Sequence, residues 1–376
     1  MSINIPNKDQ WQKMNEHLSN IAGALGTQID VSTWEGVQKA VRAGVATELF
    51  PIGTQLKVNH SVYGERLYDV VAHDYFKSVH NEDAHTMTLM CHDPISLVQY
   101  DGSEAFYYAD NELPAGTYNF TIDSAYGSWT TGTYQFTLTK ALPKGGQLCI
   151  NGDIGAAMTA RKVNSYASRT TTEISESVAI TLGNSGINLG TFGIELNHSH
   201  RVSSGSNNYK ESAIRQFLNS SAEAGSVWTP QTKFDRPPDW ASSVPGFTNG
   251  FDSDFLNIVG KVIVPCAANA IYESPDSTTV AGQKYTVADK FYLASQAEIL
   301  GTFADTVVDD STRFPYYEGA ANIDCIKYGD GFAVYWWTRS VYPWFANIQR
   351  TINVEGGAYN LLPYGTANCV PVFTIV

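Results

Sequence analysis

Cysteine is scarce in this sequence, and the few cysteines present are not arranged for pairing. The chain of 376 residues contains five of them, an odd number, spread widely and never in a C-x-x-C pair. This pattern argues against a scaffold stapled by disulfides. We therefore expect free and mostly buried thiols at Cys91, Cys149, Cys266, Cys325 and Cys369.

Long apolar runs and an excess of positive charge are also absent. No stretch reaches the roughly 18 apolar residues that cross a bilayer, and the start "MSINIPNKDQW" has neither the basic nor the apolar part of a signal peptide. With 24 Lys+Arg against 37 Asp+Glu, the net charge of −13 opposes binding to phosphate backbones or anionic lipid. The sequence thus predicts synthesis in the cytoplasm, no membrane insertion and no nucleic-acid partner.

Motifs of the common enzyme and cofactor sites are missing. There is no G-x-S-x-G, no phosphate-binding glycine loop and no H-E-x-x-H, and the histidines near Asp or Glu have no recognised metal-ligand spacing. Two carboxylate pairs, Asp252 with Asp254 and Asp309 with Asp310, stand in turn-like segments, where aspartate more often accepts backbone N–H bonds than catalyses hydrolysis. We predict a protein that is not an enzyme and binds no cofactor or metal.

The chain does have ample material for packed cores, with 43% hydrophobic and 12% aromatic residues. Residues 1–50 show the apolar spacing of two short helices, the second with Ser32 as its expected N-cap. Trp11 and Trp34 are the largest side chains of their apolar stripes. Because short helices are marginal alone, we expect this helical segment to pack on itself, on a sister subunit or on a partner, and to serve oligomerisation or docking.

Beyond this segment the apolar pattern changes to the two-residue period of β-strands. Residues 101–150 contain short, evenly spaced strand patterns such as "AGTYNFTI" and "GTYQFTLTK", which are typical of a separate small sandwich or barrel. Past about residue 190 one clear helix pattern, "NYKESAIRQFLNSS", stands among turns rich in Pro, Gly and Asp. The sequence therefore predicts a mixed α+β chain with a β-rich body.

The last forty residues combine bulky aromatics with amides and hydroxyls, almost without charge. Tyr and Trp supply rigid contact area and Asn supplies adaptable hydrogen bonds, so this composition is typical of a recognition surface. The alternative is that the aromatics fill the core of a final β-hairpin, which we favour for Trp336 and Trp337. For the segment 344–349, where apolar and amide residues do not alternate cleanly, we favour binding.

Several motifs carry a resemblance to a known family. "YWWTRS", the later "EGG" and the closing "VPVFTI" follow "NNYKESAIRQFLN", "KFYLASQAEILG" and "FPYYEGA" in order. In this the chain resembles the variable proteins of diversity-generating retroelements, of the type found with phage and prophage tails of gut Firmicutes, whose variable region ends a C-type-lectin fold. Thr338 and Val341 depart from the family pattern, which usually has Leu and Pro there.

The resemblance implies a fold and a domain organisation. The expected fold is α+β: a C-type-lectin-like domain with an inserted all-β sandwich or barrel module and a short N-terminal helical segment. The lectin-like domain would comprise residues 51–100 and 191–376, the inserted module 101–190, and the variable region about 338–370. Three sequential domains are the alternative. The Glu-Pro-Asn, Gln-Pro-Asp and Trp-Asn-Asp motifs of calcium-dependent lectins are absent, which speaks against calcium-dependent sugar capture.

The resemblance also implies roles for individual residues. Trp336, Trp337, Arg339 and Ser340 would be scaffold. The expected ligand-binding, variable positions are Tyr342, Trp344, Phe345, Asn347, Gln349, Thr351, Asn353, Tyr359, Asn360, Leu362, Tyr364 and Asn368.

The function implied is that of a receptor-binding protein on a phage or prophage tail, whose surface a reverse transcriptase diversifies by errors at adenines. Its expected partners are a bacterial cell-surface receptor, protein or glycan, and other tail proteins; a homotrimer is the expected assembly and the virion the expected location. Two alternatives stay open. One is a variable ligand-binding protein displayed on the bacterial surface, and the other is an enzyme of the formylglycine-generating type, which shares the fold but needs a reactive cysteine pair.

Overall fold

The computed structural model describes an α+β fold that is mostly β-sheet with a few short helices, which confirms the coarse fold class expected from the sequence. Within the described residues, no helix is long and apolar enough to cross a membrane. The structure describes residues 29–376 apart from 96, 103–106, 110, 123–131, 139–140, 142–143, 145–146, 150–156, 166–167, 174–177, 182–188, 193–195, 199–205, 232–234, 269–282, 302–308, 310 and 344–347.

A five-stranded antiparallel sheet forms the centre of the body and joins the two ends of the described chain. Its order is β1-β2-β3-β23-β16, so the C-terminal strand β23 lies between an early strand and β16. Alternating burial along β1 shows one covered face, whereas β3 and β23 are buried throughout. The strands are β1 (Gln55–His60), β2 (Gly64–His73), β3 (Met87–Cys91), β16 (Phe291–Leu293) and β23 (Pro371–Ile375).

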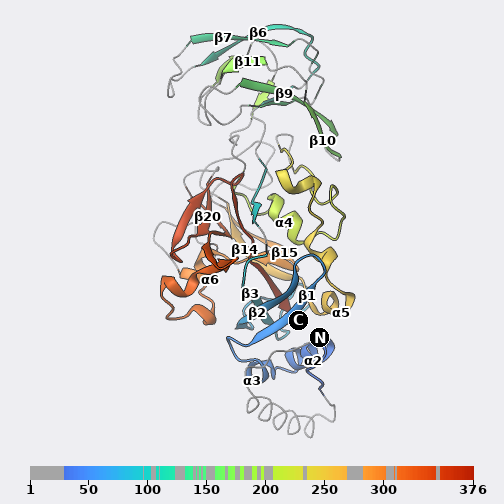
Figure 1. Cartoon of the computed structure of the whole chain (residues 1–376), viewed down its shortest axis with the longest axis vertical. Helices are drawn as coiled ribbons and strands as arrows, with labels where there is room; N and C mark the ends of the chain where they lie inside the picture. Colours follow the sequence, from blue (N-terminus) through green and yellow to red (C-terminus); the bar gives the residue numbers. More distant parts are fainter. Residues whose placement is uncertain are drawn as a thin grey trace.

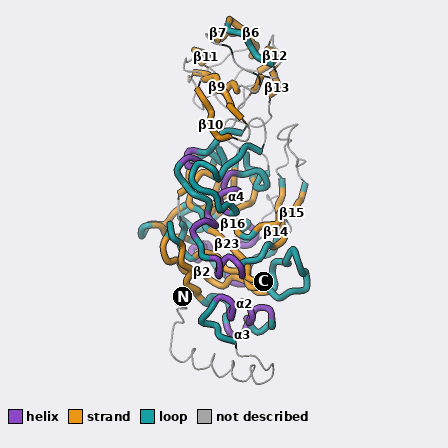
Figure 2. The backbone as a smooth tube through the Cα atoms, turned by 90° about the vertical axis from the view of Figure 1, so that its right-hand side faces the viewer, coloured by secondary structure: helices purple, strands orange, loops and turns teal. Residues whose placement is uncertain are grey.

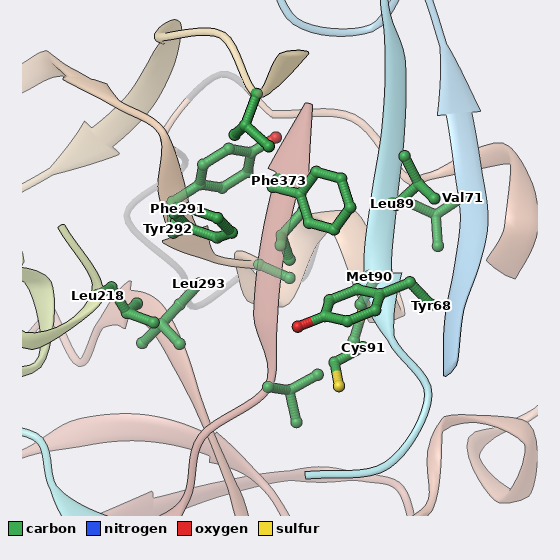
Figure 3. Packing of buried hydrophobic residues seen from close by; sticks show 14 of the residues in the cluster. Tyr68, Val71, Leu89, Met90, Cys91, Leu218, Phe291, Tyr292, Leu293 and Phe373 are labelled. Atoms are coloured by element: carbon green, nitrogen blue, oxygen red, sulfur yellow. The ribbon is translucent and has the colours of Figure 1, made fainter. Parts of the chain in front are cut away.

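Aromatic rings from distant parts of the chain pack against this sheet. Phe373 of β23 lies 5.8 Å from Phe291 and 5.0 Å from Tyr68, measured between ring centroids. Figure 3 shows these rings among the buried apolar side chains around β23; Leu89 and Met90 are successive residues of β3 and point to opposite faces of the sheet. Because each buried aromatic removes a large apolar area from water, these contacts stabilise the sheet around β23.

A second five-stranded sheet carries the C-terminal segment. Its order is β21-β20-β19-β22-β4, in which only the β19–β22 pair is parallel and β21 is an edge strand. Figure 1 shows β20 beside the short helix α6 (Gln296–Leu300). The strands are β4 (Leu97–Gln99), β19 (Trp336–Val341), β20 (Gln349–Ile352), β21 (Ala358–Leu361) and β22 (Thr366–Asn368).

Two hairpins and two further helices complete the body around these sheets. They are the hairpins β14 (Val262–Ala267) with β15 (Lys284–Asp289) and β17 (Lys327–Gly329) with β18 (Phe332–Val334), and the helices α4 (Ala213–Leu218) and α5 (Ser253–Ile258). The helix predicted around "NYKESAIRQFLNSS" is α4, capped by Ser212, whose hydroxyl accepts from the Arg215 N–H. Asp252 caps α5 in the same way, since its carboxylate accepts from the Phe255 N–H at 2.8 Å.

The second N-terminal helix packs on its own chain. It forms α2 (Trp34–Arg42) and, beyond Gly44 at φ +73°, the single turn α3 (Ala46–Leu49). Its N-cap is Thr33, which accepts from the Gly36 N–H at 3.1 Å, and not Ser32. Trp34 is buried, with its ring 5.1 Å from that of Phe255 in α5. The apolar stripe of α2 is therefore not free for a partner, which corrects our expectation for Trp34; Trp11 lies outside the described residues.

Strands between residues 107 and 198 pair only with one another in the part of the chain that the structure describes. Figures 1 and 2 place several of them at one end of the long axis and α2 and α3 toward the other end. The domain boundaries given above stay a prediction. The strands are β5 (Tyr107–Ala109), β6 (Gly116–Ile122), β7 (Gly132–Leu138), β8 (Gln147–Cys149), β9 (Ala157–Ser165), β10 (Ser168–Glu173), β11 (Val178–Thr181), β12 (Leu189–Phe192) and β13 (Leu196–His198).

Candidate functional site

A buried arginine holds β19 in place. The Arg339 guanidinium forms an ion pair with Glu298 and donates to the carbonyl oxygens of Leu293 (2.8 Å) and Pro265 (2.9 Å) and to the Ser311 hydroxyl (2.9 Å). Both charged side chains are fully buried. Although burial acts to lower the pKa of Arg339, the Glu298 carboxylate raises it well above its ordinary value, so the guanidinium stays charged.

The start of helix α6 presents the other half of this ion pair. Ser295 and Glu298 form a capping box, in which the Glu298 carboxylate accepts from the Ser295 N–H at 2.8 Å and the Ser295 hydroxyl accepts from the Glu298 N–H at 3.1 Å. The Ser340 hydroxyl in turn accepts from the Gln296 N–H at 2.8 Å. Scaffold roles were expected for Arg339 and Ser340, and these contacts show how both residues attach β19 to α6.

Trp336 and Trp337 are fully buried. The Trp337 indole donates to the Val98 carbonyl of β4 at 2.8 Å, and its ring lies 5.5 Å from that of Tyr100. A buried indole with a satisfied N–H packs as core rather than as a recognition group. Trp337 therefore packs as core; Trp336 is also fully buried, although its indole N–H has no hydrogen-bond partner among the described residues.

Two residues expected at the binding surface are instead interior. Gln349 and Thr351 of β20 are fully buried, so the expectation that they face a ligand is wrong. Between Trp337 and Val341 the β19–β20 register shifts, with three residues of β19 (338–340) opposite a single residue of β20, Arg350. Side chains bridge this irregular stretch: the Gln349 amide donates to the Thr338 carbonyl at 2.6 Å, and the Thr338 hydroxyl donates to the Arg350 carbonyl at 2.9 Å.

A loop leaves the end of β19 and returns to the start of β20. Its base is closed by the Asn207 amide, which donates to the carbonyls of Tyr342 (3.3 Å) and Ile348 (2.7 Å), and by the Tyr342 N–H, which donates to the Ile348 carbonyl. Tyr342 is half-buried beneath the Arg350 guanidinium, which lies 4.7 Å from its ring centroid. Trp344, Phe345 and Asn347, expected at the binding surface, lie outside the described residues.

The edge strand β21 is the most exposed part of this sheet. Tyr359 and Asn360 are exposed there, and Tyr359 keeps 45% of its surface in water. The Tyr359 ring lies 5.2 Å from that of Tyr335, and the Asn360 carbonyl oxygen accepts from Arg350 at 2.9 Å. Both side chains are thus accessible on a strand whose backbone the neighbouring β20 holds in register.

The turn between β20 and β21 is built by Asn353. Its carboxamide oxygen accepts from the N–H groups of Glu355 (3.0 Å) and Gly357 (2.8 Å), so this expected binding residue is committed to its own turn. Gly356 has φ +77°, and a Cβ there would lie 1.6 Å from the Asn322 carbonyl oxygen. The backbone therefore requires glycine at Gly356, the first glycine of "EGG".

The remaining expected residues border a second turn. Leu362 is half-buried and Tyr364 is exposed at 40%, and the turn between them is closed by the Gly365 N–H donating to the Leu362 carbonyl. The Tyr364 carbonyl accepts from the Gln99 amide at 2.8 Å, which leaves its ring available. Asn368 is half-buried and donates from its amide to the Tyr335 carbonyl at 3.1 Å.

Sequence analysis missed two exposed aromatics on the β17–β18 hairpin. Tyr328 and Phe332 are exposed at 53% and 76%. The buried Lys327 ammonium anchors this hairpin by donating to the Cys91 carbonyl at 3.0 Å, and β18 runs directly into Tyr335, whose ring contacts Tyr359. The signal available in the sequence was "KYGDGF", in which two aromatic residues stand at the tip of a hairpin. We call Tyr328, Phe332, Tyr359 and Asn360 the edge surface.

Cys91, Cys266, Cys325 and Cys369 are buried, and burial raises the pKa of each thiol, to about 12 for Cys91. Cys325 and Cys369 therefore hold little thiolate at neutral pH. Across the described ranges, no group of three or more His, Cys, Asp or Glu side chains could hold a metal ion. Asp309 lies 3.8 Å from the Arg339 guanidinium and belongs to the buried ion-pair network.

Comparison with known proteins gives one match. A family model described as "Domain of unknown function (DUF6273)" matches residues 174–375, more than half of the chain. That range contains β19 to β22 and the whole edge surface. Neither a curated protein nor a solved structure matches the chain.

Core and surface aromatics should respond differently to substitution. Trp337→Ala is expected to lower the free energy of unfolding by about 3–5 kcal/mol, because it leaves a cavity and an orphaned carbonyl. Tyr364→Ser should lower it by less than about 1 kcal/mol, as at ordinary surface sites. Denaturant titration of both variants measures the difference; equal losses would contradict the division into scaffold and surface.

The Arg339–Glu298 pair should behave as one unit. Arg339→Leu alone is expected to cost about 3–5 kcal/mol of stability, because it strands a buried carboxylate. The double variant Arg339→Leu with Glu298→Leu should recover much of that loss, since the Glu298 carboxylate is removed together with its partner and only Asp309 of the buried network remains. A double-mutant cycle by chemical denaturation tests this, with Lys39→Leu and Glu35→Leu, an exposed pair at 2.7 Å, as the control cycle. Additive losses at the buried pair would refute the coupling.

Proposed function

The chain belongs to the DUF6273 family of unknown function, and from the site geometry we propose that it is a non-enzymatic receptor-binding protein whose C-terminal surface is free to vary. Under this proposal it acts on a phage or prophage tail and binds a protein or glycan on a bacterial cell. The fold would be of the C-type-lectin kind, with the strands between 107 and 198 as an inserted module.

One observation carries the proposal: within a single sheet, the residues that hold the backbone are separate from the residues that meet the solvent. Trp337 and Arg339 of β19 are buried and fully hydrogen-bonded to other elements. Two strands away, Tyr359 and Asn360 of β21 are exposed, and the turn leading to them is fixed by Asn353 and Gly356. A side chain on β21 can therefore change while its backbone stays in place.

The chemistry of the edge surface suits recognition. Tyr328, Phe332 and Tyr359 offer rigid aromatic area, and Asn360 offers an amide beside the Arg350 guanidinium. Aromatics with an amide and an arginine are the side chains that most often anchor binding surfaces. Exposed aromatics cost solubility, which a protein tolerates where they have a partner.

Retroelement diversification is supported by the sequence resemblance and by the codons involved. Tyr and Asn codons contain adenine, whereas the Trp codon contains none, so errors at adenines spare Trp336 and Trp337 and reach Tyr359, Asn360 and Tyr364. In this structure the spared residues are buried and the three others are exposed. The same errors would also reach Gln349 and Thr351, which are buried, so the agreement between codon and exposure rests on the two tryptophans and these three exposed residues.

Binding should depend on the edge surface. Tyr359→Ser and Phe332→Ser are each expected to weaken binding of the labelled full chain to gut Firmicutes cells by at least about tenfold, at unchanged melting temperature. Val62→Ser is the matched control, since Val62 is 54% exposed in the turn between β1 and β2. Flow cytometry over a broad strain panel measures the effect. Equal weakening by Val62→Ser, or no strain bound, would count against the proposal.

The coding locus should show the diversifying machinery. We expect a reverse-transcriptase gene nearby and a near-copy of the DNA encoding about residues 338–370, with differences between related clones confined to template adenines. Substitutions should gather at Tyr359, Asn360 and Tyr364 and spare Trp337. Sequencing related isolates decides this. If no template copy exists and the differences fall evenly over buried and exposed positions, diversification is wrong, although receptor binding is still open to the cell-binding test.

A further inference from the structure

A pocket of about 930 Å³ lies near the end of the molecule that carries α2. It is formed by α2, the loop before β3, the chain leading into β14, and the end of β23; Figure 2 shows the C-terminus between α2 and the β14–β15 hairpin. Its lining includes three cations, Arg42, Lys261 and Lys290, together with His80 and His85. None of the edge-surface residues takes part.

Among the described residues, Lys261 and Lys290 of this pocket have no anionic partner. Elsewhere in the described residues Lys39, Lys57 and Lys77 each pair with a glutamate, as expected in a chain of net charge −13. Arg42 donates to the oxygen of the final residue, Val376 (3.2 Å), whereas Lys290 donates to the Leu256 carbonyl (2.6 Å). Asp83, the single carboxylate side chain in the lining, forms no ion pair with any of them.

The positive charges of Lys261 and Lys290 also repel each other. Burial lowers the pKa of Lys290, and the nearby charge of Lys261 lowers it further. Two ammonium groups held close in a partly enclosed space raise the local positive potential, which a bound anion would relieve. The uncompensated charge is thus a feature of the pocket and not of one flexible side chain.

The rest of the lining is largely apolar. Val79, which is 41% exposed, Ile258, Val259 and Ala288 contribute to the walls. Gly260 lets the Val376 side chain close one side, because a Cβ at Gly260 would lie 2.2 Å from a Val376 methyl. A pocket with apolar walls and a few convergent charges is the usual form of a small-molecule site.

We propose that this pocket binds a small organic anion, with a phosphate or carboxylate group between Lys261 and Lys290 and an apolar body against Val79 and Ala288. The site is independent of the edge surface and of the function proposed for it. Its occupant compensates two positive charges at the end of the molecule that carries α2, where the last strand meets that helix.

The probe is phenyl phosphate, compared with inorganic phosphate, titrated into the full chain by calorimetry. Phenyl phosphate should bind saturably and more tightly than inorganic phosphate, and more weakly at high salt. Lys261→Gln and Lys290→Gln should each weaken phenyl phosphate about tenfold, the loss typical of one charged hydrogen bond. Lys261 makes no side-chain bond in the structure, so its variant is expected to fold normally. Ala288→Phe should weaken phenyl phosphate by occupying the apolar wall.

Lys39→Gln is the control: it removes the same charge from the same end of the molecule, but from an ion pair outside the pocket lining. Its affinity for phenyl phosphate should equal that of the unmodified chain. No saturable binding up to about 10 mM, which corresponds to less than about 3 kcal/mol, would overturn the proposal. Equal weakening by Lys39→Gln and Lys261→Gln would overturn it as well, because net charge alone would then explain the binding.

Discussion

The buried ion pair between Arg339 and Glu298 is the constraint on which the C-terminal part of the structure depends. Removing two charges from water costs several kcal/mol per ion, and only a closely fitted set of partners offsets that cost. Arg339 finds such a set on four separate segments: α6, the strand β16, the strand β14 and the chain at Ser311. Any displacement of β19 would leave at least one buried charge without its partner.

This constraint explains why the neighbouring strands β19, β20 and β21 can differ so much in the burial of their side chains. β19 is fixed by its own side chains, and β20 is fixed to it through Gln349 and Thr338 as well as through the backbone ladder. β21 then needs only backbone pairing with β20 and the Asn353 turn to stay in register. The interior strands thus supply the stabilising side-chain contacts, and the side chains of the edge strand are not needed for packing. Substitutions on such separate sets of residues are expected to combine additively.

Part of this arrangement follows from the sequence. The burial of Trp336 and Trp337 could be predicted because two adjacent tryptophans in a strand near "TRS" would expose a large apolar area to water. The helix α4 could be predicted from the spacing of its apolar residues. The positions of Gln349 and Thr351 could not be predicted, since the register shift opposite them changes which side chains face inward. The aromatics Tyr328 and Phe332 were missed because the exposure of their side chains depends on how the hairpin is anchored. The anchor is the buried Lys327, which donates to the Cys91 carbonyl.

Thr338 and Val341 supply hydrogen-bonding groups at the same shift. Thr338 uses its hydroxyl to bond the Arg350 carbonyl inside a fully buried stretch. Val341 has a backbone N–H and pairs with Gln349 where the regular ladder resumes. A leucine at 338 would lack the hydroxyl and a proline at 341 would lack the N–H, so neither residue could make these bonds. The end of β19 is thus bonded to β20 on both sides of the interruption in backbone pairing.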